Sequence, residues 1–495
     1  MGGIFLSEET RVNAPPGEVF ALFGQDAGAG WLFDAAFDAL RPGAVVRFRI
    51  PWPAGSGGDG APAGCGGDGT LEATGRIVSV RPGSRMVLAH ETPWRGRVVC
   101  TLTPDGGGTR VRVVAEIDDS GIAWLLARSG HEPPGPAAEP GSHPVGLLVS
   151  LSGSASVFAA ASENLARMAV EEANADGGVC GGPLRLVVAD DATDARVGAR
   201  RMRWLVRAGC RAVFTNVTSA TFAAIEPIAR AAGVLLIYTP VNEGGRGGHG
   251  LLRLGERPAG QLSLAVPYLM RDSGGRRWFL AGNDYVWPRA SNRQARRIIG
   301  AAGGEVAGER YAAIGTRRFE PLVEEIERSR ADLVVSTFVG ADEALFERAC
   351  HAAGLRARVR TLSLALDEAT REHAGDAAGA GLYTAFGYYQ QLPIAANRAF
   401  LARYRERYGP VAPPVSSISE SVYEAVHLYA AAARGIRGGG EPAEIGRALP
   451  GSTLRGPRGR IRVAGHDRLE QDLHLVRAVP GGFAHEATAE PKPRP

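Results

Sequence analysis

The segment Trp278-Phe-Leu-Ala-Gly-Asn-Asp-Tyr-Val-Trp-Pro-Arg-Ala-Ser-Asn292 holds an apolar run, two further aromatic residues and a helical pattern that starts at Pro288. The short apolar run predicts a buried strand, and proline is favoured in the first turn of a helix. Tyr285 and Trp287 therefore lie on a strand-to-helix turn. Because open α/β sheets bind ligands beyond the carboxyl ends of their strands, both rings are candidate ligand-binding residues.

The same rhythm of apolar strand and amphipathic helix runs through most of the chain after Val145. Helices are expected between the strands, for example at 155–175 and 195–208. This alternation predicts parallel sheets with helices on both faces, and the strands are too many for one compact half, so two doubly wound lobes are expected. The predicted strands are 145–149, 184–189, 212–215, 234–238, 278–281, 333–337, 361–364 and 382–386.

The first part of the chain has a different pattern, with short strands, turn signals and one early helix at 16–23. Alternating apolar and polar residues in Thr109-Arg-Val-Arg-Val-Val114 indicate a half-buried antiparallel strand. The strands expected there are 44–50, 71–80, 86–90, 98–103 and 109–117. We therefore expect an α+β domain at 1–130, a proline- and glycine-rich linker at 131–143, the two-lobed domain at 144–485 and a disordered tail at 486–495.

The composition narrows the function. A chain of 495 residues is too long for one core, and its formal net charge of +4 comes without the concentrated basic stripe that nucleic-acid binding requires. The five cysteines form neither a zinc-binding pattern nor a disulfide framework. The first residues lack the features of a signal peptide, and no apolar run is long enough to cross a membrane. We expect a cytoplasmic protein without membrane insertion; a periplasmic or extracellular location is the alternative.

Two glycine-rich segments, Gly55–Gly60 and Gly64–Gly69, match the dinucleotide fingerprint G-x-G-x-x-G. The fingerprint needs a following helix whose N-terminus holds the pyrophosphate, whereas the strand at 71–80 follows here. The two segments are interpreted as a loop, and no cofactor is expected. No P-loop, nucleophile elbow or H-E-x-x-H motif occurs either, so the sequence does not predict an enzyme.

Polar side chains follow several of the predicted strands of the first lobe. Ser152 precedes a helix, where it either binds a ligand or, like Ser154, caps the helix. Hydroxyl groups at Thr218, Ser219 and Thr221 surround the start of one helix, which exceeds what capping requires. The next strand ends in Tyr238 and Thr239, and Tyr238 is either a ligand contact or a core aromatic. The candidate ligand-binding residues are Ser152, Thr218, Ser219, Thr221, Tyr238, Thr239, Tyr285 and Trp287.

These pieces together resemble the type I periplasmic-binding-protein family over about residues 144 to 480. The Asp-Tyr-x-x-Pro-Arg core at Asp284–Arg289 is similar to the amide and urea receptors of that family. The other matching segments are Gly177–Pro183, Thr218–Thr221, Tyr238–Gly244, Ser336–Gly340 and Gly456–Val463. The resemblance implies two lobes that close on a small solute and three chain crossings at a hinge.

On the same resemblance, Ser219 donates a hydrogen bond to the ligand and Tyr238 lines the same wall. Tyr285 covers the ligand from the opposite lobe. An amide or urea is planar and has both donors and acceptors, which an aromatic face and hydroxyl groups satisfy without buried charge. The chain departs from the branch at Val217, where relatives often have tyrosine, and at Asn242, where they have an aromatic residue.

Asp367 and Trp287 each have a structural as well as a ligand-binding interpretation. Asp367 follows a strand of the second lobe and is interpreted as an acidic helix N-cap. Trp287 either lines the cleft or packs beneath the helix that starts at Pro288, and the sequence does not choose between these. Each of these positions depends on how the lobes pack.

The N-terminal region resembles the START-like superfamily that includes the Hsp90-ATPase-activator homologues. Such domains enclose an apolar cavity under a long C-terminal helix, whereas the helix expected here, Ile122–Arg128, is short and an insertion at 53–68 interrupts the strands. The segments that match are Val12–Phe23, Leu40–Val46, Ile77–Arg85 and His90–Trp94. His90, Glu91 and Arg95 are its clustered ionisable residues, and at a strand end they are expected to face solvent.

The sequence thus favours a binding protein over an enzyme. The leading hypothesis is a cytoplasmic sensor of a small polar ligand, namely an amide, a urea or an amino-acid-like molecule, whose lobe closure is reported to a regulatory partner. The second is the substrate-binding component of an ABC-type uptake transporter, whose partner is a permease. The third is a START-like lipid-binding or cyclase-like enzyme that the two-lobed domain regulates.

Overall fold

The computed structural model describes residues 4–24, 34–51, 70–118, 121–122, 124, 140–245, 247–436 and 440–491. Three predicted features lie outside these residues. They are the insertion at 53–68, the two fingerprint-like segments Gly55–Gly60 and Gly64–Gly69, and most of the expected linker. The chain divides into two compact units. The first comprises Met1–Pro134, Leu151–Ser156 and Arg405–Ala412; the second comprises Gly135–Ser150, Val157–Tyr404 and Pro413–Pro495.

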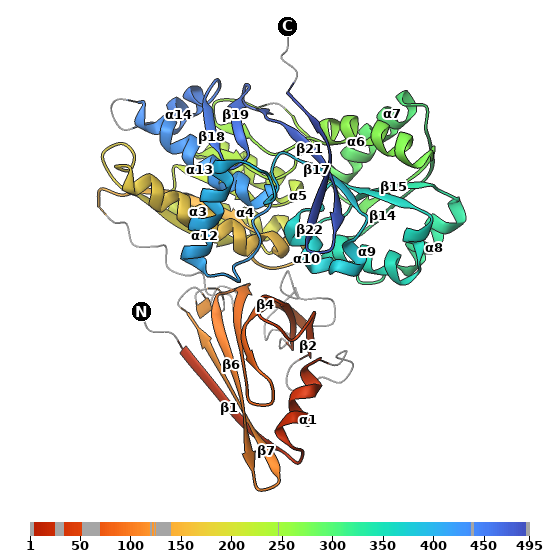
Figure 1. The fold of residues 1–495 in the computed structure, drawn as a ribbon. Helices are drawn as coiled ribbons and strands as arrows, with labels where there is room; N and C mark the ends of the chain where they lie inside the picture. The colour runs from red at the N-terminus through yellow and green to blue at the C-terminus, as the bar shows by residue number, and fades with distance from the viewer. Residues whose placement is uncertain are drawn as a thin grey trace. The chain divides into compact units, whose positions relative to one another are not determined.

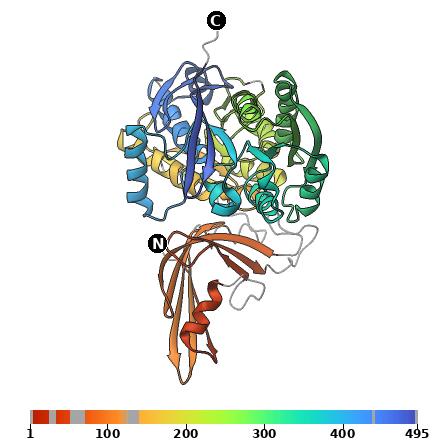
Figure 2. The same ribbon diagram turned by 45° about the vertical axis from the view of Figure 1, so that its right-hand side comes forward.

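The first unit is built on a seven-stranded antiparallel sheet in the order β1-β7-β6-β5-β4-β3-β2. Helix α1 (Pro16–Ala21) lies against one face of this sheet, where Val19 and Phe20 join the sheet's apolar residues in one core (Figure 2). The edge strands β1 and β2 were not predicted from the sequence pattern. The strands are β1 (Ile4–Val12), β2 (Asp34–Phe37), β3 (Val45–Pro51), β4 (Thr70–Arg81), β5 (Arg85–Thr92), β6 (Gly96–Asp105) and β7 (Gly108–Ile117).

The second unit contains two α/β lobes. Lobe one has a parallel sheet in the order β12-β11-β10-β8-β9, so the chain turns back between the neighbours β8 and β10. Its strands are β8 (His143–Val149), β9 (Leu184–Asp190), β10 (Ala212–Asn216), β11 (Leu235–Tyr238) and β12 (Leu251–Arg253). Its helices are α3 (Ala159–Ala175), α4 (Ala195–Arg207), α5 (Ser219–Ala231), α12 (Ala395–Tyr408), α13 (Ser417–Arg434) and α14 (Pro442–Ala448), with the small sheet β18 (Thr453–Gly456), β19 (Gly459–Val463) and β20 (Leu469–Glu470) (Figure 1).

Lobe two has a seven-stranded sheet in the order β14-β13-β15-β16-β17-β21-β22, and the chain turns back between β13 and β15. The first five strands in this order are parallel, and the last two join them antiparallel. The strands are β13 (Arg277–Asn283), β14 (Glu305–Ala312), β15 (Leu333–Thr337), β16 (Arg360–Ser363), β17 (Tyr383–Phe386), β21 (Leu473–Val479) and β22 (Gly482–Ala489). The helices are α6 (Pro258–Ser273), α7 (Val286–Ala301), α8 (Glu320–Ser329), α9 (Ala341–Ala352), α10 (Glu368–Ala374) and α11 (Asp376–Gly379).

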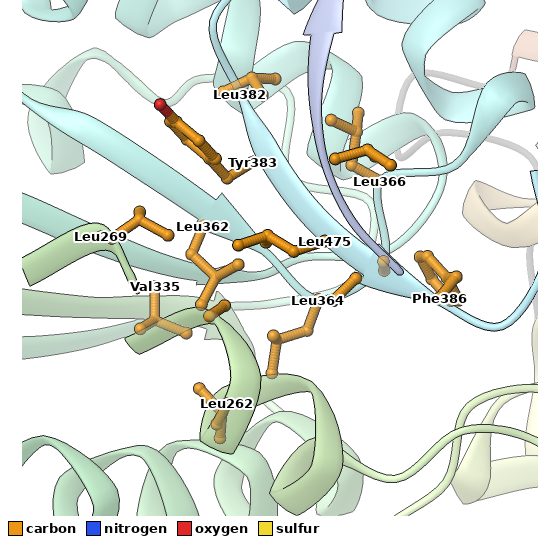
Figure 3. Close-up of a cluster of buried hydrophobic side chains, with 14 of the residues drawn as sticks. Leu262, Leu269, Val335, Leu362, Leu364, Leu366, Leu382, Tyr383, Phe386 and Leu475 are labelled. Atoms are coloured by element: carbon orange, nitrogen blue, oxygen red, sulfur yellow. The ribbon is translucent and has the colours of Figure 1, made fainter. Parts of the chain in front are cut away.

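The core of lobe two packs helix α6 onto one face of this sheet. Leu262 and Leu269 of α6 lie with buried residues of β15, β16, β17 and β21 in one apolar cluster (Figure 3). These strands are apolar along their length because both faces of the sheet are covered. The two-lobed prediction is therefore confirmed, with a mixed rather than a wholly parallel sheet in lobe two.

The chain passes between the lobes three times: from β12 to α6, from β17 to α12 and from β20 to β21. A buried cluster of charges joins these crossings. Glu256 in the first crossing accepts hydrogen bonds from the backbone N–H of Gly387 (3.0 Å) in the second and from the Ser417 hydroxyl (2.7 Å). Arg458 contacts Glu256 (3.4 Å) and donates to Gln471 (2.5 Å) in the third.

Two boundaries differ from those expected. A 3-10 turn, Ser154–Phe158, precedes α3, so the helix begins at Ala159 rather than at 155, and neither Ser152 nor Ser154 is its N-cap. At the other end, β22 continues to Ala489, where a disordered tail was predicted from residue 486. Pairing with β21 explains the error, because a strand held by a partner needs little apolar character of its own.

Candidate functional site

Three polar side chains of lobe one meet beyond the carboxyl ends of β10 and β11. The Ser219 hydroxyl, in the first turn of α5, donates to a carboxylate oxygen of Glu243 (2.7 Å) and lies 3.2 Å from the Tyr238 hydroxyl. The Tyr238 hydroxyl also donates to the Val217 carbonyl (3.2 Å). The Tyr238 ring stacks on Phe222 at 4.1 Å, inside the lobe's core. Tyr238 is thus a core aromatic whose hydroxyl group alone reaches the cluster.

Tyr285 approaches this cluster from lobe two. It is the N-cap residue of α7 and follows the end of β13 by two residues. Strand β13 borders the point where the chain of lobe two turns back. Burial raises the pKa of its hydroxyl well above the ordinary value, and the neighbouring Tyr238, Glu243 and Asp342 raise it further. Glu243 and Tyr238 belong to the opposite lobe, so Tyr285 lies within electrostatic range of the cluster that contains Ser219, and its part in ligand binding stays a prediction.

The other hydroxyl groups near the start of α5 have structural partners. Thr218 is the N-cap of α5 and accepts from the Thr221 backbone N–H (3.4 Å). The Thr221 hydroxyl donates to buried Asp191 (2.7 Å), and the Thr239 hydroxyl donates to the Thr215 carbonyl (3.0 Å). Thr218 and Thr221 are thus engaged in capping and bracing, and the part of these hydroxyls and of Thr239 in ligand binding stays a prediction.

Trp287 is 1% exposed and packs in the hydrophobic core of lobe two. Of its two proposed positions the structure shows the packed one beneath α7. Ser152 is also buried, and it belongs to the segment Leu151–Ser156 that groups with the first unit. Its part in ligand binding stays a prediction.

Glu243 was not singled out from the sequence. It lies in a loop that Asn242 braces: the Asn242 side chain accepts from the Gly244 backbone N–H (3.0 Å) and donates to the Gly255 carbonyl (3.2 Å). Gly244 and Gly245 take positive φ angles of 84° and 130°, which glycine adopts without strain. The Asn-Glu-Gly-Gly run is typical of such a turn, and this signal would have marked the loop.

The structure confirms the prediction that Asp367 is a helix N-cap. Its carboxylate accepts from the Thr370 backbone N–H (2.9 Å) as the N-cap of α10. Burial raises its pKa to about 6, although hydrogen bonds from Ser416 and Thr370 oppose that rise.

His90 and Glu91 of the first unit were expected to face solvent, but the structure shows both side chains largely covered. His90 lies between the rings of Phe48 (5.2 Å) and Trp94 (6.0 Å), and burial lowers its pKa to about 4. The Glu91 carboxylate forms an ion pair with Arg76 (2.6 Å) in which both side chains are nearly covered. Phe48 is distant from His90 in sequence, and Trp94 lies beyond the end of β5. The strand pattern therefore did not show that these rings pack around His90.

Two absences hold for the described ranges alone. None of their helices combines the length and apolar character of a membrane span. No group of three or more histidine, cysteine, aspartate or glutamate side chains in them is arranged to hold a metal ion.

Comparison with known proteins gives one family. The family profile described as "Periplasmic binding protein" matches residues 142–483. Among curated proteins, the Leu/Ile/Val-binding protein BraC3 of Rhizobium johnstonii is 25% identical over 194 residues, which are 38% of this chain and 53% of that protein. The Leu/Ile/Val-binding protein homolog 3 of Brucella melitensis biotype 1 is 24% identical over 43% of this chain and 59% of its own length. The chain thus spans between half and three fifths of these relatives.

Solved structures show the same fold. A solute binding protein of an ABC transporter from R. palustris, in complex with benzoate, is 20% identical with a TM-score of 0.64, covering 71% of this chain and 97% of its own. The leucine binding protein LivK from Thermotoga maritima is 19% identical with a TM-score of 0.62, covering 70% and 99%. At this identity the likeness establishes the type I two-lobed fold of residues from about 142 onward.

Proposed function

The chain belongs to the periplasmic binding protein family, and on that premise we propose that it captures a small solute between its two lobes and delivers it to the permease of an ABC-type transporter. The transporter role is supported by the similar R. palustris protein, which is a solute binding protein of an ABC transporter. The curated relatives in Rhizobium and Brucella are named as Leu/Ile/Val-binding proteins. Lobe closure around the solute would be the step that the permease reads.

One observation carries the ligand class that we propose: a carboxylate, Glu243, accepts the hydrogen bond of Ser219 beside the Tyr238 hydroxyl and lies within electrostatic range of Tyr285. An ionised carboxylate only accepts hydrogen bonds, so the matching ligand group must donate them. On the lobe-two side, buried Asp342 lies near Tyr285 and already accepts hydrogen bonds from Asn283 (2.7 Å) and from the Gly315 backbone N–H (2.9 Å), so Glu243 is the acceptor that we assign to the ligand. A ligand N–H group, from an amide, a urea or an amino acid, satisfies this acceptor.

The test is a thermal-shift screen of small amides, ureas and amino acids, since a ligand that binds only the folded state raises the melting temperature. Tyr285→Phe keeps the ring and removes the hydroxyl. We expect it to weaken binding by about 1–3 kcal/mol, or roughly 5- to 150-fold, because the ligand group it contacted is left unsatisfied. Isothermal titration measures the change in Kd.

Tyr311→Phe is the matched control, because Tyr311 is a tyrosine of lobe two whose hydroxyl donates to Glu309 on the edge strand β14. It should bind like the wild type. If Tyr285→Phe binds every ligand of the wild type with unchanged Kd, Tyr285 is not in the site. If nothing in the screen shifts the wild type, the proposed ligand class is wrong.

A second candidate is a cytoplasmic ligand sensor, and the observation that favours it is the separate first unit with its own core. In this alternative the first unit is a START-like module that passes lobe closure to a regulatory partner. Fractionation of the native protein separates the two candidates. Recovery outside the cytoplasmic membrane contradicts the sensor, whereas recovery in the cytoplasm contradicts delivery to a permease from outside.

A further inference from the structure

A hollow of about 390 Å³ opens in the second unit beside the polar cluster of Ser219, Tyr238, Glu243 and Tyr285. Its lobe-one wall is the braced loop Glu243–Gly245. Its other walls are the start of α6 and one face of α7. The residues that matter for its chemistry are Glu243, Arg257, Ala259, Arg293, Gln294 and Arg297.

Positive charge dominates this hollow, since three arginines face one carboxylate. Arg257 is already held by Asp467 (2.9 Å). Arg293 and Arg297 are four residues apart on α7 and so share a face, where their like charges repel each other. Such a repulsive pair is an unfavourable arrangement for the isolated helix, and an anion between the two side chains would relieve it.

The other arginines of α7 are paired, and these two are not. Arg289 forms an ion pair with Asp284 (2.7 Å), and Arg296 forms one with Glu309 (2.5 Å). Within the described residues neither Arg293 nor Arg297 forms an ion pair. Of the α7 arginines, the two for which the described part of the chain supplies no ion pair are thus the two that line the hollow.

The backbone adds to the positive potential. Helix α6 starts at Pro258 on the wall of the hollow, and its N-cap residue, Arg257, makes no side-chain capping hydrogen bond. The N-terminal end of a helix carries a partial positive charge, although here Pro258 has no N–H and the N–H groups of Gly260 and Gln261 already donate to the Arg257 carbonyl. This end therefore reinforces the charge of the arginines on an anion in the hollow.

Glu243 connects the hollow to the polar cluster, because it lines the hollow and accepts the hydrogen bond of Ser219. We infer that the ligand carries two groups: an N–H donor that binds at Glu243 and the hydroxyls, and a carboxylate that enters the hollow between Arg293 and Arg297. Amino acids, amido acids and ureido acids have this pair of groups. A guanidinium matches a carboxylate with two parallel hydrogen bonds, which favours this anion there. The inference rests on the proposed function and narrows its ligand class.

The experiment uses the whole chain and pairs of probes that differ by one carboxylate. The pairs are propionamide with succinamate, propylurea with 4-ureidobutyrate, and isopentylamine with leucine. Isothermal titration at low salt should show roughly tenfold or tighter binding of the carboxylate member in at least one pair. In the double variant Arg293→Gln/Arg297→Gln, the affinity for that member should fall to near that of its neutral or amine partner.

Arg296→Gln is the matched control, because it removes the same charge from the same helix away from the hollow. It should keep the carboxylate preference. Equal affinities within every pair in the wild type, or a preference that survives in the double variant, overturn the inference. If uncharged probes bind in a Tyr285-dependent way without any carboxylate preference, the inference alone fails; if no probe binds, the proposed function fails with it.

Discussion

Neighbouring residues at the start of α5 point in different directions because each step along a helix turns by about 100°. Ser219 faces the polar cluster, Thr218 caps the helix, and Thr221 reaches back to Asp191 beside β9. Asp191 is fully buried and accepts a second hydrogen bond from the Thr193 backbone N–H (3.0 Å). The Asp191 carboxyl group therefore lies behind the site, where water does not reach it.

This carboxyl predicts a pH effect on stability. Burial raises the pKa of Asp191 to about 7, whereas an unfolded aspartate has a pKa of about 3.9. The folded state therefore holds a proton that the unfolded state releases. This contribution to the free energy of unfolding is fully present below about pH 4 and is lost as the pH rises through about 7, by up to about 1.4 kcal/mol per pH unit.

Asp191→Asn, which resembles the protonated form, should remove this dependence. Urea unfolding of the wild type and the variant at pH 5 and pH 8 measures it, and the wild type should lose more stability than the variant between the two values. Subtracting the unfolding free energies of the two proteins at each pH removes the contribution of the other buried acids, which both proteins share. Parallel pH profiles would show that Asp191 does not titrate in this range.

At the scale of elements, the position of Tyr285 depends on how closely α7 packs on β13 and β15. A Cβ atom at Gly282 would lie 1.9 Å from the Thr337 hydroxyl oxygen and 3.1 Å from the Pro288 side chain. The Thr337 hydroxyl is itself buried and donates to the Ala281 carbonyl (2.9 Å). The absence of a side chain at Gly282 thus allows this turn to place Tyr285 in the cleft.

Gly282→Ala should therefore destabilise the protein by about 1–3 kcal/mol, because the crowded strand and helix must move apart. Gly300, near the other end of α7, has nothing within 4 Å of its Cβ position. Gly300→Ala should instead stabilise by about 0.5–1 kcal/mol, since alanine loses less conformational freedom in a helix. Urea denaturation of both variants is the measurement. Equal effects of the two changes would contradict the packing at Gly282.

At the scale of the whole two-lobed unit, one buried arginine, Arg458, contacts two of the three crossings, through Glu256 in the first and Gln471 in the third. Arg458 has ion pairs with Glu256 (3.4 Å), Glu424 (2.9 Å) and Glu420, all of them almost fully buried. Burial raises the pKa values of Glu420 and Glu424, and the charge of Arg458 opposes that rise. The geometry of the hinge therefore depends on this cluster as well as on the backbone.

Arg458→Gln leaves three buried carboxyl groups without their cation, and we expect it to cost about 3–5 kcal/mol of unfolding free energy. Arg462→Gln, in the adjoining strand β19, removes an exposed ion pair with Glu470 (3.2 Å) and should cost at most about 1 kcal/mol. Chemical denaturation distinguishes these values. A cost below about 1 kcal/mol for Arg458→Gln would mean that the cluster does not hold the hinge.

The sequence by itself determined the alternation of strands and helices after Val145, the two lobes and the placement of Ser219, Tyr238 and Tyr285 at strand ends. Hydrophobic periodicity, proline at a helix start and polar residues after apolar strands are local signals, so a single chain shows them. Edge strands such as β1 and β14 were missed because β1 is exposed from Phe5 to Arg11 and β14 has no fully buried residue, so neither shows a clear apolar pattern.

The tertiary structure alone decided which side chains face the cleft. It placed Trp287 in the core and brought Glu243 to Ser219. It also made Arg293 and Arg297 line the same hollow as the loop Glu243–Gly245 of lobe one. These residues are far apart in sequence, and their directions follow from the packing of whole lobes. Proximity of this kind arises from long-range contacts between elements, which leave no periodic signal along the chain.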